Sequence, residues 1–258
     1  MPETGRVDHV SYVTHGDAAP GLVLMHGFTD SAACWDPIVP ALRKRTGVVA
    51  VDARGHGESG LPEEPVGPAV QAGDVARVLD ALGVTSVVAM GHSMGAVTAV
   101  SLAIAHPDRV RALILEDPPP YSGAGRPVGV PETLLKLRRM SVAERIATGR
   151  AEHPRWPDAE FQPWALAQDA FQLRFCELPV EPFPPLRESL PRVRCPVLLL
   201  YGDPGQGGLI SPEFAAELAE LMGDRLTTRQ LDAGHSVRRD DQAGYLAAVD
   251  AFLERVLA

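Results

Sequence analysis

The residues with the clearest chemical potential are the five at 91–95, which read Gly-His-Ser-Met-Gly. They lie between an apolar run at 87–90 and a helix-like run at 96–105, and a serine at such a strand–turn–helix junction is typical of a nucleophile elbow. The tight turn forces a positive φ on the central residue, and the flanking glycines remove side chains that would clash there. We therefore predict that Ser93 is a nucleophile. A simple helix N-cap would explain the serine but not both glycines.

A serine hydroxyl becomes a good nucleophile when a neighbouring base removes its proton, and histidine is the natural base near neutral pH. His235 follows a strand-like stretch at 227–231 and comes after Ser93 in the chain, as the order serine, acid, histidine requires. We predict that His235 is the catalytic base. The alternative is a surface-loop histidine beside Asp232. His92 adjoins the nucleophile and is predicted to be structural.

Attack by a serine on a carbonyl creates an oxyanion, which needs two preorganised hydrogen-bond donors. One should be the backbone N–H of Met94, the residue after the nucleophile. The other should come from the loop at 26–29, which reads His-Gly-Phe-Thr and follows an apolar run at 22–25. The N–H of Phe28 is the best candidate for this second oxyanion donor.

The elements that must position these residues alternate along the chain. Continuous apolar runs predict buried strands at 22–25, 48–51, 87–90, 110–115 and 197–201. Helix-like segments occupy 37–45, 68–82, 94–105, 212–222 and 241–257. This alternation predicts an α/β fold with a doubly wound, mostly parallel sheet and helices on both faces. The candidate residues all follow strands, where open α/β sheets bind their ligands.

The alternation breaks in one long, proline-rich segment. Helix-like runs occur at 131–149 and 158–177, whereas no convincing strand does. A structureless loop of this length is uncommon within a compact domain. We therefore predict two units, which are a core domain formed by 1–117 and 191–258 and an inserted helical cap at 118–190.

Much of the aromatic content lies in this predicted cap. Packing of the cap helices is the default role for these rings, and a lining of an apolar substrate pocket is the alternative. We predict a pocket lined by Phe28 from the oxyanion loop and by Trp156 and Trp164 from the cap.

Composition limits the partners and the location. The chain has 258 residues, is 45% hydrophobic and carries a formal charge of −9, which leaves no basic stripe for a nucleic acid. No signal peptide is evident, and no apolar run reaches the about 18 residues of a membrane span. The cysteines Cys34, Cys176 and Cys195 fit no metal-site spacing. We predict a cytoplasmic monomer or homodimer that acts on a small molecule, with no membrane or nucleic-acid partner.

Four motifs occur together and in order: His-Gly-Phe at 26–28, Asp-Ala-Arg-Gly-His-Gly-Glu-Ser at 52–59, the elbow at 91–95, and Gly-His at 234–235. With them, the chain from about residue 10 to its end resembles the α/β-hydrolase fold superfamily, and the cap is the part covered least well. The resemblance implies an eight-stranded, mostly parallel sheet, a cap domain and a Ser–acid–His triad. It implies no metal and no organic cofactor.

The acid is where the sequence departs from the common pattern. Many relatives carry an aspartate three residues after the glycine found here as Gly202, and this chain has Gly205 there. The resemblance offers a second position, at the end of the strand that follows the elbow helix, as in some lactone hydrolases and haloalkane dehalogenases. Asp117 occupies it and is the predicted acid. Asp203 and Glu116 remain alternatives, although strand alternation places Glu116 and Asp117 on opposite sides.

The run from Gly55 to Gly60 also fits the dinucleotide-binding pattern G-x-G-x-x-G. That site requires a helix to start inside the motif, and Leu61-Pro62 cannot continue one. We therefore predict no bound NAD. Asp52 and Arg54 are expected instead to make local hydrogen bonds that support the oxyanion loop.

Together these features predict a serine hydrolase that cleaves an ester or lactone of a medium-sized, apolar molecule through an acyl-enzyme. A serine at position 93 argues against dehalogenase and epoxide-hydrolase chemistry, for which the resemblance would require an aspartate. Carbon–carbon bond hydrolysis, perhydrolysis and acyl transfer use the same triad and remain alternatives. A non-catalytic ligand receptor built on the scaffold is a further one.

Overall fold

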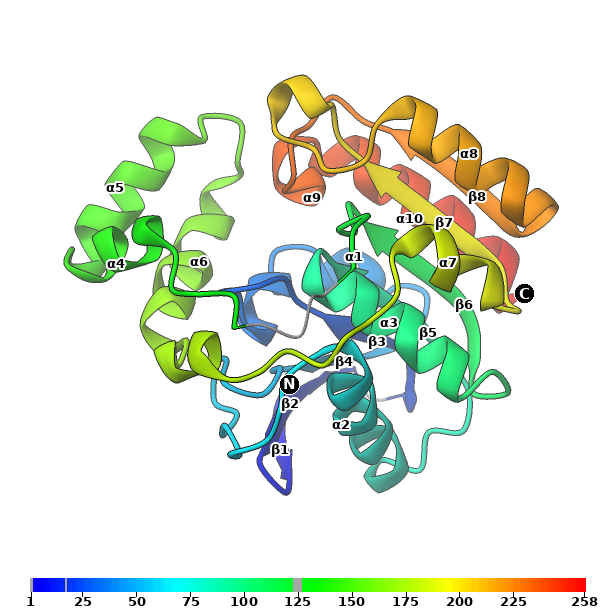
Figure 1. Ribbon diagram of the computed structural model, residues 1–258, viewed down its shortest axis with the longest axis horizontal. Helices are drawn as coiled ribbons and strands as arrows, with labels where there is room; N and C mark the ends of the chain where they lie inside the picture. The colour runs from blue at the N-terminus through cyan, green and yellow to red at the C-terminus, as the bar shows by residue number, and fades with distance from the viewer. Residues whose placement is uncertain (1, 17, 123–126) are drawn as a thin grey trace.

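The computed structural model describes residues 2–16, 18–122 and 127–258, which form an eight-stranded sheet in the order β1-β2-β4-β3-β5-β6-β7-β8 (Figure 1). The strands are β1 (Glu3–Val7), β2 (Val10–His15), β3 (Pro20–Met25), β4 (Gly47–Val51), β5 (Val87–His92), β6 (Val110–Glu116), β7 (Val197–Tyr201) and β8 (Leu226–Gln230). Pairing is parallel from β4 through β8, whereas β1 pairs antiparallel with β2 and β2 with β4. The predicted α/β fold is confirmed.

The strands from β3 to β8 match the predicted apolar and strand-like runs. The β1–β2 hairpin was not located from the sequence. Most residues of β1 are exposed or half-buried, so the strand lacks the continuous apolar run that marks the buried strands.

Helices cover both faces of the sheet. The α-helices are α1 (Val39–Leu42), α2 (Pro68–Ala81), α3 (Met94–Ala105), α4 (Glu132–Arg138), α5 (Val142–Glu152), α6 (Asp158–Ala170), α7 (Leu186–Ser189), α8 (Pro212–Met222), α9 (Val237–Asp240) and α10 (Gln242–Leu257). Short 3-10 helices are η1 (Ala32–Trp35), η2 (Leu173–Glu177), η3 (Leu190–Arg192), η4 (Pro204–Gln206) and η5 (Gly223–Arg225). Within the described ranges, no helix combines the length and apolar character that crossing a membrane requires.

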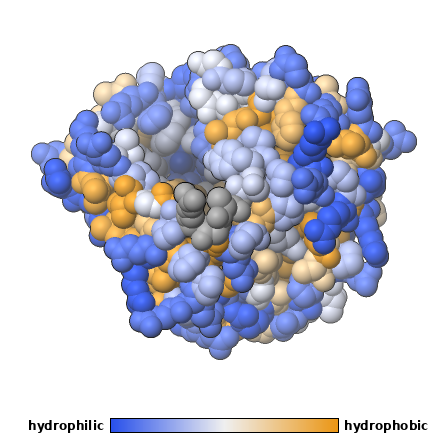
Figure 2. All heavy atoms as spheres, in the orientation of Figure 1, coloured by the Kyte–Doolittle hydropathy of each residue, from blue (hydrophilic) through white to orange (hydrophobic). Residues whose placement is uncertain are grey.

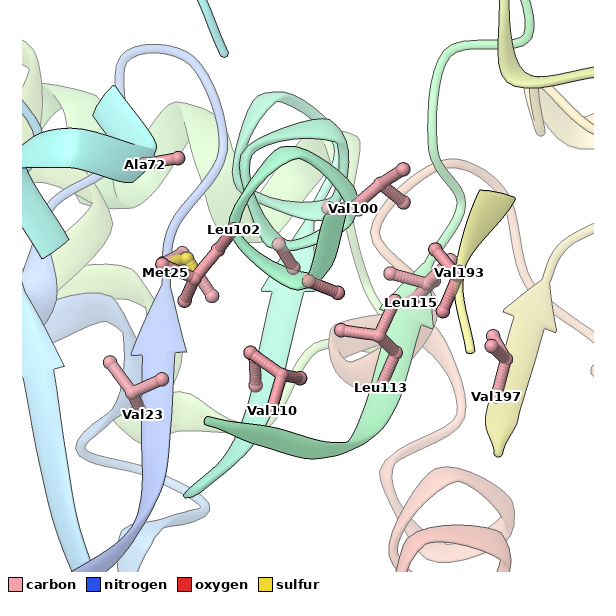
Figure 3. Close-up of a cluster of buried hydrophobic side chains, with 14 of the residues drawn as sticks. Val23, Met25, Ala72, Val100, Leu102, Val110, Leu113, Leu115, Val193 and Val197 are labelled. Atoms are coloured by element: carbon pink, nitrogen blue, oxygen red, sulfur yellow. The ribbon is translucent and has the colours of Figure 1, made fainter. Parts of the chain in front are cut away.

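Two apolar clusters form the core. Leu113 and Leu115 of β6 belong to the cluster with α2, α3 and α8, part of which Figure 3 shows. Ile114, between them, belongs to the cluster on the other face with α1 and α10. This alternation along one strand explains why the buried strands are apolar at every position.

The segment from 132 to 170, here called the α4–α6 segment, lies to one side of the sheet (Figure 1). The helix predicted at 131–149 is in fact two helices, because Ser141 caps α5 in a reciprocal pair of hydrogen bonds with Glu144. The predicted cap, 118–190, also includes residues 123–126, which lie outside the described residues. Leu186 and Leu190, near its end, pack into the core. The division into core and cap stays a prediction.

Helix α3 begins against the ends of β3 and β5 without room for a side chain. A Cβ atom on Gly95 would overlap the backbone carbonyl of Met25, and one on Gly91 would overlap the carbonyl of Gly95. This close backbone approach fixes the position of Ser93 between the two glycines.

We expect Gly95→Ala to lower the free energy of unfolding by about 3 kcal/mol, because the new methyl group must displace packed backbone. Gly73→Ala is the matched control, since a Cβ on Gly73 within α2 would meet just the Arg77 Nη1 atom at 3.8 Å. That control should raise stability by about 0.5–1 kcal/mol through helix propensity. Denaturant unfolding measures both changes, and equal stabilities of the two variants would contradict the packing argument.

Candidate active site

Ser93 sits in a strained turn between β5 and α3. Its φ is 50° and its ψ is −113°, a backbone conformation that costs a non-glycine residue about 1–3 kcal/mol. The Ser93 N–H donates to the Glu116 carbonyl at 2.9 Å, and the Ser93 carbonyl accepts from Ala96 at 3.0 Å. These bonds hold the turn. The φ of 50° confirms the positive value predicted for position 93.

The His235 ring is paired with the carboxylate of Asp117. The His235 Nδ1 atom lies 2.6 Å from Asp117 Oδ2. Asp117 is fully buried, and its carboxylate also accepts from the backbone N–H groups of Leu209 at 2.9 Å and Ile210 at 3.4 Å. A carboxylate held this way fixes the tautomer of the imidazole, which leaves Nε2 free to exchange a proton.

Within the described residues, neither of the two alternative acids bonds to the His235 ring. Asp203 caps the short helix η4, and its Oδ1 accepts from the Gly205 N–H at 2.8 Å. The Glu116 side chain points to the opposite side of β6, as strand alternation predicts, and accepts from Arg238. Among these three carboxylates, the geometry favours Asp117 as the partner of His235.

Ser93 and His235 line the same cavity of about 640 Å³. Figure 2 shows the surface hollowed between the α4–α6 segment and α9. Most of the remaining wall is apolar and includes Val66, Val97, Trp156, Trp164, Phe175, Val180, Phe183 and Leu209. Within the described residues no hydrogen bond joins the Ser93 hydroxyl to the His235 ring, and such catalytic bonds are often long before substrate binds.

The two predicted oxyanion donors also lie at this cavity, since Phe28 and Met94 both line it. Met94 is the first residue of α3, where the first N–H groups of a helix lack partners within the helix. In the described part of the chain, the Phe28 N–H makes no hydrogen bond to a protein acceptor. Its ring packs edge-on against Phe171 with 5.1 Å between centroids.

The loop that carries Phe28 is held from the side by the segment after β4. Asp52 Oδ1 accepts from the Ala32 N–H at 2.7 Å, and His26 Nε2 accepts from the Ala53 N–H at 3.0 Å. The support predicted from Asp52 is confirmed. The same prediction for Arg54 is wrong, because its guanidinium pairs with the buried Asp74 of α2 at 2.7 Å.

His92 contributes more than the sequence indicated. Its Nε2–H donates to the backbone carbonyl of His235 at 3.0 Å, so it supports the loop that carries the candidate base. Burial, together with the charges of His235 and Arg238, lowers the pKa of His92 well below its usual value, and it therefore donates as a neutral ring.

A buried ion cluster lies behind the same loop. Arg238 pairs with Glu116 and Asp30, and Arg239 pairs with Asp30 at 3.1 Å and with Glu160 of α6 at 3.0 Å. Burial would raise the pKa of Asp30, but the two guanidinium groups outweigh it and hold that pKa well below its usual range. This cluster could not be predicted from the sequence, because its members come from segments far apart in the chain.

The sequence profile of the family described as "Alpha/beta hydrolase family" matches residues 22–249. The chain belongs to the alpha/beta hydrolase family. It is 33% identical to N-formylmaleamate deformylase of Pseudomonas putida over 257 aligned residues, which cover 95% of this chain and 93% of the relative.

Solved structures share the fold over nearly the whole chain. The crystal structure of E-2-(acetamidomethylene)succinate hydrolase superposes with a TM-score of 0.76 at 24% identity, covering 98% of this chain and 100% of that one. The enol-lactonase of Burkholderia xenovorans gives a TM-score of 0.72 at 26% identity with the same coverage. The family match and the 33% identical deformylase identify the protein as a hydrolase.

We expect Asp117→Asn to lower kcat by about 10⁴-fold while the fold is kept, because an amide cannot hold the required imidazole tautomer. Asp203→Asn is the matched control and should change kcat by less than about threefold, since its partner is a loop amide. Turnover of a p-nitrophenyl ester measures both. Near wild-type activity in the first variant and a large loss in the second would move the acid to Asp203.

The buried His56 should make stability depend on pH. Burial and the nearby His26 lower its pKa to about 3, so the folded state stays unprotonated where the unfolded chain takes up a proton. The contribution of the neutral His56 to the free energy of unfolding is complete above about pH 6.5. It is lost as the pH falls toward about 3, at about 1.4 kcal/mol per pH unit. Denaturant unfolding from about pH 7 to 5 should show a shallower loss in His56→Gln than in the wild type. Identical slopes would contradict this.

Proposed function

We propose that this hydrolase cleaves a carboxylic ester or lactone of a medium-sized, apolar small molecule through an acyl-enzyme. The observation that carries the proposal is the His235–Asp117 pair, at 2.6 Å, on the same apolar cavity as the strained Ser93. A positioned base on the same cavity as a half-buried serine is the arrangement that acyl transfer can use.

In this mechanism Ser93 Oγ attacks the substrate carbonyl while His235 Nε2 accepts its proton. Asp117 keeps the proton on His235 Nδ1 and stabilises the imidazolium that forms. The tetrahedral oxyanion accepts hydrogen bonds from the N–H groups of Phe28 and Met94. His235 then protonates the departing alcohol oxygen, and a water molecule, deprotonated by the same ring, releases the acid and restores Ser93.

The wall of the cavity supports a neutral, apolar substrate. Among its described residues the single lysine or arginine is Arg239, and that charge is already paired with Asp30 and Glu160. A carboxylate on the substrate would therefore find no unpaired lysine or arginine among the described wall residues, and its transfer from water into the cavity would be unfavourable. Trp156 and Trp164 provide flat apolar surface for the part of the substrate away from the reacting carbonyl.

We further propose that the α4–α6 segment acts as the cap over this site and that a folded protein is too large a substrate for it. The three cysteines are free thiols, which supports the predicted cytoplasmic location. The oligomeric state, monomer or homodimer, stays a prediction.

Hydrolysis of a small N-acyl amide is a second candidate. The deformylase of Pseudomonas putida aligns over almost the whole of both chains at 33% identity, and its name describes removal of a formyl group. The same three side chains would serve, with His235 protonating a nitrogen leaving group in place of an oxygen.

We expect stoichiometric labelling of Ser93 by a fluorophosphonate probe, because labelling needs an activated hydroxyl. Ser93→Ala should abolish it, and His235→Ala should slow it by at least about 100-fold. A panel of p-nitrophenyl esters, lactones and N-formyl amides then separates the two candidates by kcat/KM. An unlabelled wild-type protein would contradict the proposal and favour a non-catalytic receptor. Labelling without turnover of the panel would favour carbon–carbon bond hydrolysis, perhydrolysis or acyl transfer.

A further inference from the structure

The loop that carries His235 is tied to the α4–α6 segment by one carboxylate. The indole Nε1–H of Trp156 donates to Asp240 Oδ1 at 2.9 Å, and the other oxygen, Oδ2, accepts from the Gly234 N–H at 2.8 Å. Gly234 is the residue before His235. Asp240 thus links an aromatic side chain of the cavity wall to the backbone that sets where the imidazole lies.

A second set of contacts holds the same loop two residues earlier in the chain, at Asp232. The Arg155 guanidinium donates to the Asp232 carbonyl at 2.9 Å and to Gln206 Oε1 at 2.7 Å, and Gln206 donates in turn to Asp232 Oδ1 at 2.9 Å. The loop at 231–236 has no regular secondary structure. Backbone bonds that join Leu231 to Tyr201 and Ala233 to Asp203 hold its first half. Two consecutive residues of the α4–α6 segment add side-chain contacts there, Arg155 at Asp232 and Trp156, through Asp240, at Gly234.

Helix α6 also reaches the oxyanion loop. Glu160, in its first turn, pairs with Arg239 beside the histidine loop at 3.0 Å. Gln168, in its last turns, donates to the Thr29 carbonyl at 3.4 Å, next to Phe28. Helix α6, which contains Pro163, accordingly contacts α9 just after the histidine loop and also contacts the oxyanion loop.

We propose that Trp156 and Asp240 are positioning residues that hold the loop carrying His235 in place for catalysis. This inference rests on the proposed role of His235 as the base. The Trp156 indole is itself fixed, since it is buried, stacks on His153 with 4.1 Å between ring centroids and lies under the Arg239 guanidinium at 4.8 Å. The Trp156–Asp240–Gly234 connection therefore acts through kcat, for small and medium-sized substrates alike.

Two tryptophans of the cavity wall provide a matched test. Trp156→Phe keeps an aromatic ring and removes the N–H donor, whereas Trp164→Phe changes a cavity-lining indole for which no hydrogen bond is recorded among the described residues. The readouts are kcat and KM for p-nitrophenyl acetate and hexanoate, and the rate of Ser93 labelling by a small fluorophosphonate.

We expect Trp156→Phe to lower kcat for both esters and the labelling rate by about five- to tenfold, with KM changed less than about twofold. Trp164→Phe should act mainly on KM for the hexanoate, because it alters the surface that the acyl chain contacts. Indistinguishable effects of the two substitutions on kcat and on labelling would overturn the inference and leave Trp156 as a wall residue.

A double-mutant cycle identifies the bond responsible. In an Asp240→Ala background, Trp156→Phe should cause no further loss of kcat, because the acceptor of its hydrogen bond is already absent. Additive losses would overturn the coupling. If Asp240→Ala fails to fold, as thermal unfolding would reveal, the comparison of Trp156→Phe with Trp164→Phe still tests the positioning role. A wild-type protein that is not labelled refutes the proposed function, whereas normal labelling with equal tryptophan variants refutes the positioning role alone.

Discussion

The close approach of α3 to the ends of β3 and β5 is the constraint on which the site depends. Gly91 and Gly95 bring backbone against backbone, which forces a positive φ on the residue between them. The strain is local and costs about 1–3 kcal/mol. The burial of apolar side chains in the sheet beneath offsets this cost. A serine in a relaxed helix cap would turn its hydroxyl toward its own helix. Here the hydroxyl faces a cavity.

The loop around His235 is held in a different way. It has no ladder or helix of its own, so buried charges and side-chain hydrogen bonds add to the few backbone bonds that hold it. Glu116, one residue before the partner of His235, accepts from the Arg238 N–H at 2.9 Å, three residues after His235. The adjacent residues Glu116 and Asp117 therefore both hold this part of the chain, Glu116 through Arg238 and Asp117 through the His235 ring. Breaking a buried pair of this kind leaves an uncompensated charge, which couples the integrity of the site to that of the core.

The same charge cluster limits what the cavity can bind. Arg239 borders the cavity, yet its charge is matched by Asp30 and by Glu160. The relatives with acidic substrates in their names share the fold, but a shared fold does not transfer a substrate. The local electrostatics support an apolar neutral molecule. They also anchor the α4–α6 segment to the core at the point where the proposed base emerges.

The sequence by itself determined the strands from β3 to β8, the α/β class and the turn at Ser93, because those features follow from local apolar runs and from glycines at fixed spacing. It also indicated His235 as the base and, through the resemblance to the α/β-hydrolase superfamily, Asp117 as the acid, with Asp203 and Glu116 as alternatives. The rings and carboxylates that follow parallel strands gather at one sheet edge, and here His235 and Asp117 lie 2.6 Å apart. The tertiary structure alone decided that the Asp203 carboxylate bonds to Gly205, that His92 supports the histidine loop, and that Trp156, Asp240 and Glu160 join the α4–α6 segment to the core. Those contacts join segments far apart in the chain and leave no periodic pattern, so only the folded arrangement of the elements brings them together.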